Sequence, residues 1–260
     1  MRQAYRTALV TGASSGLGAS FARLLAARGS ALVLVARRED RLAALAAELR
    51  DAHDADVTVL PADLASRDGL ESVAARLADG GPPIELLVNN AGRSARGSFA
   101  ELSADAIDAQ IGLNVTALAR LARAAVGGML ERGFGGILNV SSMAGFGVSP
   151  GSSVYGATKA FVTSLSESLH AELAGTGVHV TALCPGFTRT EFHAANDVEI
   201  GYLPSVAWLE ADDVARAGLA AVAEGRVLAV PGAQYKVAAG AARVLPGAVL
   251  RQLARLIGRL

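Results

Sequence analysis

The sequence predicts one α/β domain of the doubly wound type, with a mostly parallel sheet of seven strands and helices on both faces. Short apolar runs alternate with alanine-rich stretches of helical length along the chain. The apolar runs are nearly continuous, which is typical of parallel strands covered on both faces. The 260 residues are 52% hydrophobic and 18% charged, which provides enough apolar material for one large core. Strand and helix alternation of this kind gives a doubly wound sheet over residues 1–260.

The individual elements follow from these runs. We expect strands at 7–11, 31–36, 57–60, 86–89, 137–141, 179–184 and 227–230. Helices are expected at 16–28, 41–52, 67–79, 103–131, 155–174 and 212–223. The stretch 190–210 lacks a clear period, and we assign 187–210 as a substrate flap and 244–260 as an amphipathic C-terminal helix.

Charge and cysteine content exclude several classes of protein. The formal net charge is zero and the pI is near 6.9, so we expect no binding to nucleic acid. The single cysteine, Cys184, cannot form an intrachain disulfide, and it ends an apolar run, so we interpret it as a buried strand thiol. No apolar run approaches the roughly 20 residues that a membrane span needs. We therefore expect a cytoplasmic protein, and we predict no metal site.

A glycine-rich turn follows the first expected strand. The segment reads Thr11-Gly12-Ala13-Ser14-Ser15-Gly16-Leu17-Gly18, and a helix begins within it. Glycines permit a tight turn and a close approach of phosphate to the backbone, and free N–H groups at a helix start favour an anion. The spacing is G-x-x-x-G-x-G rather than G-x-G-x-x-G, but its position after the first strand predicts a nucleotide site. The candidate residues are Gly12, Ser14, Ser15, Gly16, Leu17 and Gly18.

The end of the second expected strand indicates which nucleotide binds. An NAD site favours an acidic residue there, whereas an NADP site favours arginine for the 2′-phosphate. The strand ends in Ala36-Arg37-Arg38, and no carboxylate appears before Glu39. Both arginines could simply open a solvated helix, but cations oppose the helix dipole at that position. We therefore predict NADP(H), preferred over NAD(H), with Arg37 as first phosphate contact and Arg38 and Ser14 in support.

A tyrosine and a lysine lie four residues apart at the start of another helical stretch. This spacing places Tyr155 and Lys159 on one helix face. A free tyrosine titrates near pH ~10. A neighbouring ammonium would stabilise its phenolate and make it a better proton carrier. Ser142 lies just beyond an expected strand, where its hydroxyl could hold a substrate carbonyl.

Taken together, these motifs resemble the classical short-chain dehydrogenase/reductase family over residues 6–190. The family's catalytic asparagine, serine, tyrosine and lysine match Asn114, Ser142, Tyr155 and Lys159. Its remaining cofactor contacts match Asp63, Leu64, Asn90, Ala91, Gly92, Pro185, Gly186, Thr188 and Thr190. The resemblance implies a Rossmann-type fold and a homodimer or homotetramer that pairs through 103–131 and 155–174.

The resemblance also implies a mechanism. Hydride passes between NADP(H) and a carbonyl or secondary alcohol, Tyr155 transfers the proton, and Ser142 binds the oxygen. Lys159 would lower the tyrosine pKa and hold the nicotinamide ribose, and Asn114 would keep a water in line with it. The alternatives are an NADP-sensing protein without turnover, and a C=C reductase or epimerase. The joint presence of the four residues favours carbonyl chemistry.

The residues indicate the substrate and the partners less clearly. The flap offers Phe192, Tyr202, Leu203, Trp208 and Leu209, which line either a lipophilic pocket or the protein core. In the tail, a helical wheel gathers three arginines on one face and apolar residues on the other. Packing on its own domain or on a second subunit is favoured, and peripheral contact with a membrane is the alternative.

Overall fold

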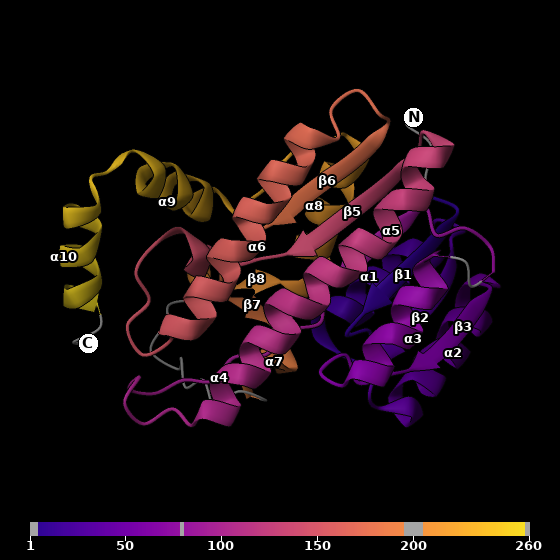
Figure 1. Ribbon diagram of the computed structural model, residues 1–260, viewed down its shortest axis with the longest axis horizontal. Helices are drawn as coiled ribbons and strands as arrows, with labels where there is room; N and C mark the ends of the chain where they lie inside the picture. Colours follow the sequence, from indigo (N-terminus) through magenta and orange to yellow (C-terminus); the bar gives the residue numbers. More distant parts are fainter. Residues whose placement is uncertain (1–4, 79–80, 195–204, 258–260) are drawn as a thin grey trace.

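The computed structural model describes residues 5–78, 81–194 and 205–257 (Figure 1). Its main sheet has the strand order β3-β2-β1-β4-β5-β6-β9, and every neighbouring pair is parallel. The strands are β1 (Thr7–Thr11), β2 (Ala31–Ala36), β3 (Val57–Pro61), β4 (Leu86–Asn89), β5 (Gly135–Val140), β6 (Val178–Leu183) and β9 (Leu228–Ala229). The predicted seven-stranded, Rossmann-type α/β fold is confirmed.

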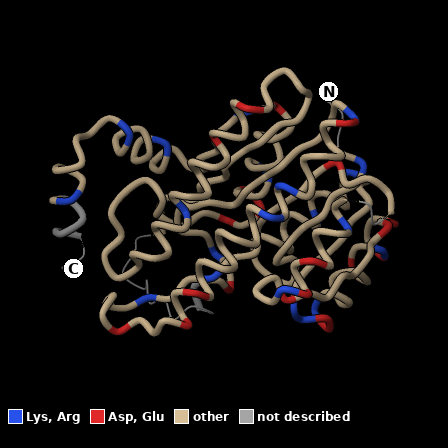
Figure 2. Tube along the Cα trace, viewed as in Figure 1, with Lys and Arg blue, Asp and Glu red and all other residues tan. Residues whose placement is uncertain are grey.

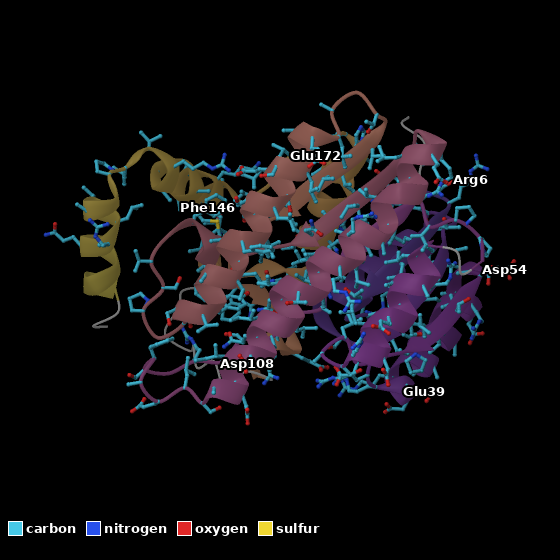
Figure 3. The ribbon with its side chains drawn as sticks, viewed as in Figure 1. Arg6, Glu39, Asp54, Asp108, Phe146 and Glu172 are labelled. Atoms are coloured by element: carbon cyan, nitrogen blue, oxygen red, sulfur yellow. The ribbon has the colours of Figure 1, made fainter. Side chains whose placement is uncertain are left out.

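Helices cover both faces of this sheet, and successive strand residues face opposite layers. In β1, Val10 packs with α1 (Gly16–Ala26), α2 (Glu39–His53) and α8 (Ala211–Ala223). Its neighbour Leu9 packs on the other side, with α3 (Arg67–Ala78) and α5 (Leu118–Arg132). Figure 3 shows the side chains that fill both layers. Two-sided burial explains why the strands are apolar at nearly every position.

The helix expected at 103–131 is divided in the structure. It consists of α4 (Ala104–Ile111), a π-helical turn η1 (Gly112–Ala117) and α5. The Oγ atom of Ser103 accepts a hydrogen bond from the N–H of Ala106 and caps α4. Gly133, in the left-handed conformation, ends α5. The π turn widens the helix at Asn114, a type of irregularity that is frequent at functional sites.

Several short elements were not predicted. They are η2 (Met143–Phe146), β7 (Thr188–Arg189), α7 (Glu191–Ala194), η3 (Ser205–Ala207) and β8 (Leu209–Glu210). The strands β7 and β8 pair in parallel, so the two ends of the flap meet. Elements of two to four residues are too short to produce a period in the sequence. The middle of the flap, with Tyr202 and Leu203, lies outside the described residues.

The C-terminal part contains two helices where one was expected. The first, α9 (Ala233–Val244), packs against η2, and the guanidinium of Arg243 lies 5.5 Å from the ring centroid of Phe146, labelled in Figure 3. The second, α10 (Gly247–Ile257), begins after Pro246 and extends beyond α9 at the edge of the molecule (Figure 1). α6 (Ser153–Glu172) lies between α9 and α5 in this view. Among the described helices, none combines the length and apolar character that crossing a membrane demands.

Candidate active site

The predicted site residues gather at the carboxyl ends of the central strands. The strand order reverses between β1 and β4, because β2 continues the sheet on one side of β1 and β5 continues it beyond β4. In open parallel sheets, ligands bind in the crevice at this point. The glycine-rich turn follows β1, Asn90 to Gly92 follow β4, and Ser142 follows β5.

The glycine-rich turn has a shape that only glycine can produce. Gly12 and Gly16 have φ angles of 66° and 54°, in the left-handed region. A side chain added to Gly18 would overlap the carbonyl oxygen of Gly12. None of the three positions therefore accepts a Cβ atom without strain or overlap, and we call this turn at the start of α1 the glycine cradle. This shape fits a phosphate group held by backbone N–H groups at a helix N-terminus.

The segment after β4 fastens this turn. The Oγ1 atom of Thr11 accepts hydrogen bonds from the N–H groups of Asn90 and Ala91, both at 3.0 Å. The Nδ2 atom of Asn90 donates to the carbonyl oxygens of Thr11 and Gly12, at 2.9 and 3.3 Å. The Asn90 side chain is thus engaged with the protein backbone, and Ala91 lies directly against Gly12.

Asn114 is buried and holds the chain around Gly92. Its Oδ1 atom accepts from the N–H of Arg93 at 2.9 Å, and its Nδ2 atom donates to the Arg93 carbonyl at 2.8 Å and to Thr158 Oγ1 at 3.1 Å. A Cβ atom on Gly92 would lie 3.3 Å from Asn114 Oδ1 and 3.5 Å from Lys159 Nζ. The structure therefore brings Asn114, Gly92 and Lys159 together. The sequence analysis did not predict a role for Thr158, and the only signal that could have indicated one is its position directly before Lys159.

Lys159 is only 4% exposed, and its ammonium faces the site from α6. The Nζ atom donates to the carbonyl oxygen of Val140 at 2.7 Å and lies 5.7 Å from the ring centroid of Tyr155. Burial lowers the pKa of Lys159 to about 8, against a smaller opposing effect of the nearby Cys184. Cys184 itself is fully buried, as predicted, and burial raises the pKa of its thiol to about 11.

Tyr155 is partly exposed and contacts Ser142. Desolvation raises the pKa of Tyr155 to about 12, and a hydrogen bond with the Ser142 side chain opposes that rise. The Oγ atom of Ser142 also accepts from the N–H of Ala144 at 3.1 Å, which fixes the hydroxyl at the start of η2. Lys159 does not contribute the expected lowering of this pKa: desolvation sets its direction, because the phenolate would lose contact with water, and Ser142 supplies the opposing effect. Tyr155 therefore carries its proton at neutral pH.

The segment from Pro185 to Thr190 reaches the glycine-rich turn from the carboxyl end of β6. A Cβ atom on Gly16 would lie 3.1 Å from Thr190 Cβ, so Thr190 lies over the glycine-rich turn. The Oγ1 atom of Thr188 donates to the Gly186 carbonyl at 3.0 Å. A side chain on Gly186 would overlap the ring of Tyr235 in α9.

Tyr235 is a site neighbour that the sequence analysis missed. Its hydroxyl accepts from the N–H of Phe187 at 3.1 Å and donates to the Ala207 carbonyl at 2.6 Å. It thereby connects both ends of the flap. The only signal for α9 was the alanine-rich run after Pro231-Gly232, which resembles a helix start.

The two adjacent arginines after β2, at the end of the site where the adenosine of a nucleotide is expected, have different contacts. The Nη2 atom of Arg38 donates to Ser14 Oγ at 3.0 Å and to Ser15 Oγ at 2.9 Å. Arg37, our first choice for the phosphate, is exposed and forms no ion pair or hydrogen bond within the described part of the chain. Figure 2 shows the charged residues at the start of α2.

After β3, the two adjacent residues predicted to contact the cofactor differ in exposure. Asp63 is exposed, and its Oδ1 atom accepts from the N–H of Ala65 at 3.0 Å, whereas Leu64 is buried in the core.

Aromatic rings lie beside the tyrosine. The ring centroids of Tyr155 and Phe192 are 6.1 Å apart, and those of Phe187 and Trp208 are 6.0 Å apart. Leu209 packs partly against the core. Within residues 5–78, 81–194 and 205–257, no three His, Cys, Asp or Glu side chains form a group able to hold a metal ion.

Comparison with known proteins agrees with this geometry. The family model described as "short chain dehydrogenase" matches residues 6–199. An uncharacterized oxidoreductase of Myxococcus xanthus is 41% identical over 202 residues, which cover 76% of this chain and 78% of the relative.

Solved structures extend the match to most of the chain. A short-chain dehydrogenase from Sphingobium yanoikuyae in complex with NADPH has a TM-score of 0.84 and 41% identity, covering 91% of this chain and 93% of the other. The bulky-bulky ketone specific alcohol dehydrogenase from Comamonas testosteroni has a TM-score of 0.81 and 36% identity, covering 93% of each chain. A short chain dehydrogenase/reductase from Burkholderia phymatum in complex with NAD is also similar, with a TM-score of 0.79 and 30% identity, covering 92% of this chain and 93% of the other.

Proposed function

Because the chain belongs to the short-chain dehydrogenase/reductase family, we propose that it is an NADP(H)-dependent oxidoreductase that interconverts a lipophilic ketone and its secondary alcohol. The single observation that carries this proposal is the convergence of Tyr155, Ser142 and Lys159 beside the glycine cradle. We also propose that residues 1–260 form one domain that carries both the cofactor site and the catalytic site.

The residues perform the proton chemistry. A bound nicotinamide would supply or accept the hydride at the carbonyl carbon. Tyr155, protonated at neutral pH, donates to the oxygen that gains negative charge, a contribution typically worth about 10²–10⁴ in rate. Ser142 donates a hydrogen bond to that same oxygen. Lys159 supplies positive charge beneath the tyrosine ring, and Asn114 positions the backbone around Gly92.

Tyr155→Phe tests the proton donor. We expect turnover to fall by at least about 10²-fold while the Kd for NADPH stays within about twofold, because the ring remains and only the acid is lost. Tyr5→Phe is the matched control, since the Tyr5 hydroxyl contacts the Val222 carbonyl and lies at the amino-terminal end of β1. Substantial residual turnover of the Tyr155 variant would contradict the assignment.

The two arginines support a preference for NADP(H). Arg38 already donates to Ser14 and Ser15 of the glycine-rich turn, and its sequence neighbour Arg37 is exposed and has no ion-pair or hydrogen-bond partner among the described residues. Guanidinium groups are the usual partners of phosphate. Arg38→Ala and Arg37→Ala should each weaken NADPH more than NADH, whereas the exposed Arg28→Ala should change neither Kd. An equal loss for both cofactors would refute the phosphate role.

Aromatic lining supports a lipophilic substrate. Phe192 lies beside Tyr155, Phe187 and Trp208 pair at the base of the flap, and a similar enzyme acts on bulky ketones. The test is NADPH oxidation against ketones and aldehydes graded in chain length, with 3-oxoacyl thioesters and a steroid ketone included. Turnover that increases with apolar size supports the pocket. Tight NADPH binding without any turnover would favour the NADP-sensing alternative.

We propose that the enzyme assembles through α4, α5 and α6. Ile111, Leu130 and Phe161, one on each helix, are large apolar residues that are each about two-fifths exposed. A second copy of the chain would cover them. Light scattering of the purified protein should give a dimer or tetramer, and Phe161→Glu should shift the population towards monomer. A wild-type monomer at micromolar concentration would refute this assembly.

We also propose peripheral contact of α9 and α10 with an anionic membrane. After Glu224 the sequence has no acidic residue and six basic ones: Arg226, Lys236, Arg243, Arg251, Arg255 and Arg259. In Figure 2 the charged residues drawn on α9 and on the described part of α10 are basic. Val237 and Val244 on α9 are 73% and 84% exposed. Apolar and basic groups together are the signature of an interfacial helix.

Vesicle flotation tests this contact. The full chain should float with vesicles that contain phosphatidylglycerol and remain behind with neutral vesicles. A chain without residues 244–260, and the full-length Arg251→Glu variant, should both lose recovery, whereas Arg28→Glu should keep it. Equal recovery of all forms would show that the tail is not the anchor.

A further inference from the structure

Glu191 joins the flap to the arginines at the adenine end. It follows Thr190 directly and begins α7. Its Oε2 atom lies 2.7 Å from Arg41 Nη1 and 3.8 Å from Arg38 Nη1. No other carboxylate in the described ranges forms an ion pair with Arg38 or Arg41. One acidic side chain therefore holds two cations of α2 and its N-terminal cap.

Arg38 connects this ion pair to the glycine-rich turn. Arg38 donates to Ser14 and Ser15 through Nη2 while its Nη1 atom faces Glu191. Thr190, the residue before Glu191, lies against Gly16 of the same turn. The segment 190–191 thus crosses the turn and ends at the guanidinium group next to it. The Glu191 carboxylate therefore lies close enough to the expected 2′-phosphate position to interact electrostatically with that phosphate.

A carboxylate and a phosphate bind guanidinium groups in the same way. Both accept paired N–H donors, so a group that binds Arg38 and Arg41 competes with Glu191 for their donors. A 2′-phosphate beside these arginines would also be repelled by the carboxylate. NADH has a hydroxyl at that position and leaves the ion pair intact. The competition acts on NADPH alone.

We propose that Glu191 is a specificity-determining residue that competes with the 2′-phosphate of NADP(H) for Arg38 and Arg41. The carboxylate offsets part of the positive charge of the two arginines and thereby limits the advantage of NADPH over NADH. Displacement of Glu191 also releases the link between α2 and the flap each time NADPH binds. The inference rests on the 2′-phosphate site proposed above.

Glu191→Gln tests the competition by direct binding. The Kd values of NADPH and NADH are measured by nicotinamide fluorescence at low salt and at 0.5 M salt. The substitution should tighten NADPH about two- to fivefold, the range that an exposed ion pair is worth, and leave NADH within experimental error. The gain should shrink at high salt, because exposed charges are screened. The same selectivity is expected for adenosine 2′,5′-bisphosphate against 5′-AMP, which lack the nicotinamide.

Glu210→Gln is the matched control. Glu210 also lies at the base of the flap and pairs with Arg189 at 3.1 Å, and the two glutamate side chains are 58% and 64% exposed. Glu210 should therefore show the general effect of removing a flap carboxylate. We expect no change in either Kd for Glu210→Gln.

Two results would overturn the inference. Weaker NADPH binding in Glu191→Gln would mean that the carboxylate positions the arginines instead of competing for them. An equal change for NADPH and NADH would mean that Glu191 acts only through the flap. Arg38→Ala separates this inference from the proposed function: an equal loss of both cofactors refutes the phosphate site itself. A selective loss in Arg38→Ala with no effect in Glu191→Gln refutes the competition alone.

Discussion

Replacing the buried Lys159 by methionine should stabilise the cofactor-free protein, by an amount that depends on pH. Lys159 is 4% exposed, and burial lowers its pKa from 10.5 to about 8. Each pKa unit corresponds to about 1.4 kcal/mol between the two protonation states. The shift therefore means that keeping this ammonium charged in the folded state costs roughly 3 kcal/mol.

The pH window follows from the direction of the shift. Below pH 8 the lysine is charged in both states, and the whole cost is present. Between pH 8 and 10.5 the unfolded chain binds more protons than the folded one, so stability rises with pH. The advantage of Lys159→Met over the wild type should fall by about 2.5 kcal/mol between pH 7 and pH 10. The lost hydrogen bond to Val140 contributes equally at every pH and leaves this change unaffected.

Urea unfolding of both proteins at pH 7, 8, 9 and 10 measures this change. Cofactor is omitted, because a ligand that binds only the folded state would raise its apparent stability. Lys236, the only other lysine of the chain, is exposed on α9, and Lys236→Met should give a small and constant difference. A difference between Lys159→Met and wild type that does not change with pH would refute the lowered lysine pKa.

Three further predictions address other parts of the structure. Gly18→Ala places a methyl group on the Gly12 carbonyl, so NADPH binding should weaken at least about tenfold and urea stability should fall by about 1–3 kcal/mol; unchanged values would contradict the cradle geometry. Gln110 is fully buried, and neither end of its amide has a hydrogen-bond partner in the structure, so Gln110→Met should raise the free energy of unfolding by about 1 kcal/mol. A destabilised Gln110 variant would indicate an ordered water at that site. Tyr235→Phe removes the bonds to Phe187 and Ala207, so the KM for the ketone should rise severalfold while the Kd for NADPH stays unchanged, and an unchanged KM would exclude a role for Tyr235 in holding the flap ends.

Much of the fold could be predicted from the sequence because parallel strands that are buried on both faces have a distinct composition. The runs around Val10, Leu34 and Leu138 are apolar at successive positions, and glycine or polar residues end them. Part of the catalytic arrangement could also be predicted from the sequence, because Tyr155 and Lys159 lie about one helical turn apart. Boundaries were less accurate: β5 begins at Gly135, two residues before the expected position, because glycine carries no strand signal.

Contacts between distant segments could not be predicted from any local pattern. Nothing near Tyr235 in the sequence indicates that its ring covers Gly186, and nothing near Glu191 indicates Arg41, 150 residues away. That Arg38 and not Arg37 contacts Ser14 and Ser15 also depends on the direction in which each side chain leaves the end of β2.

By itself, the sequence determined the seven strands of the main sheet, the longer helices between them, the glycine-rich turn and the tyrosine–lysine pair, because each depends on neighbours within about one turn or one strand. Only the tertiary structure decided the state of these groups. Burial raised the pKa of Tyr155 and lowered that of Lys159, and the crossing of residues 190–191 over the glycine-rich turn brought Glu191 to Arg38. Desolvation and long-range charge depend on what packs around a residue, and packing is a property of the folded chain as a whole.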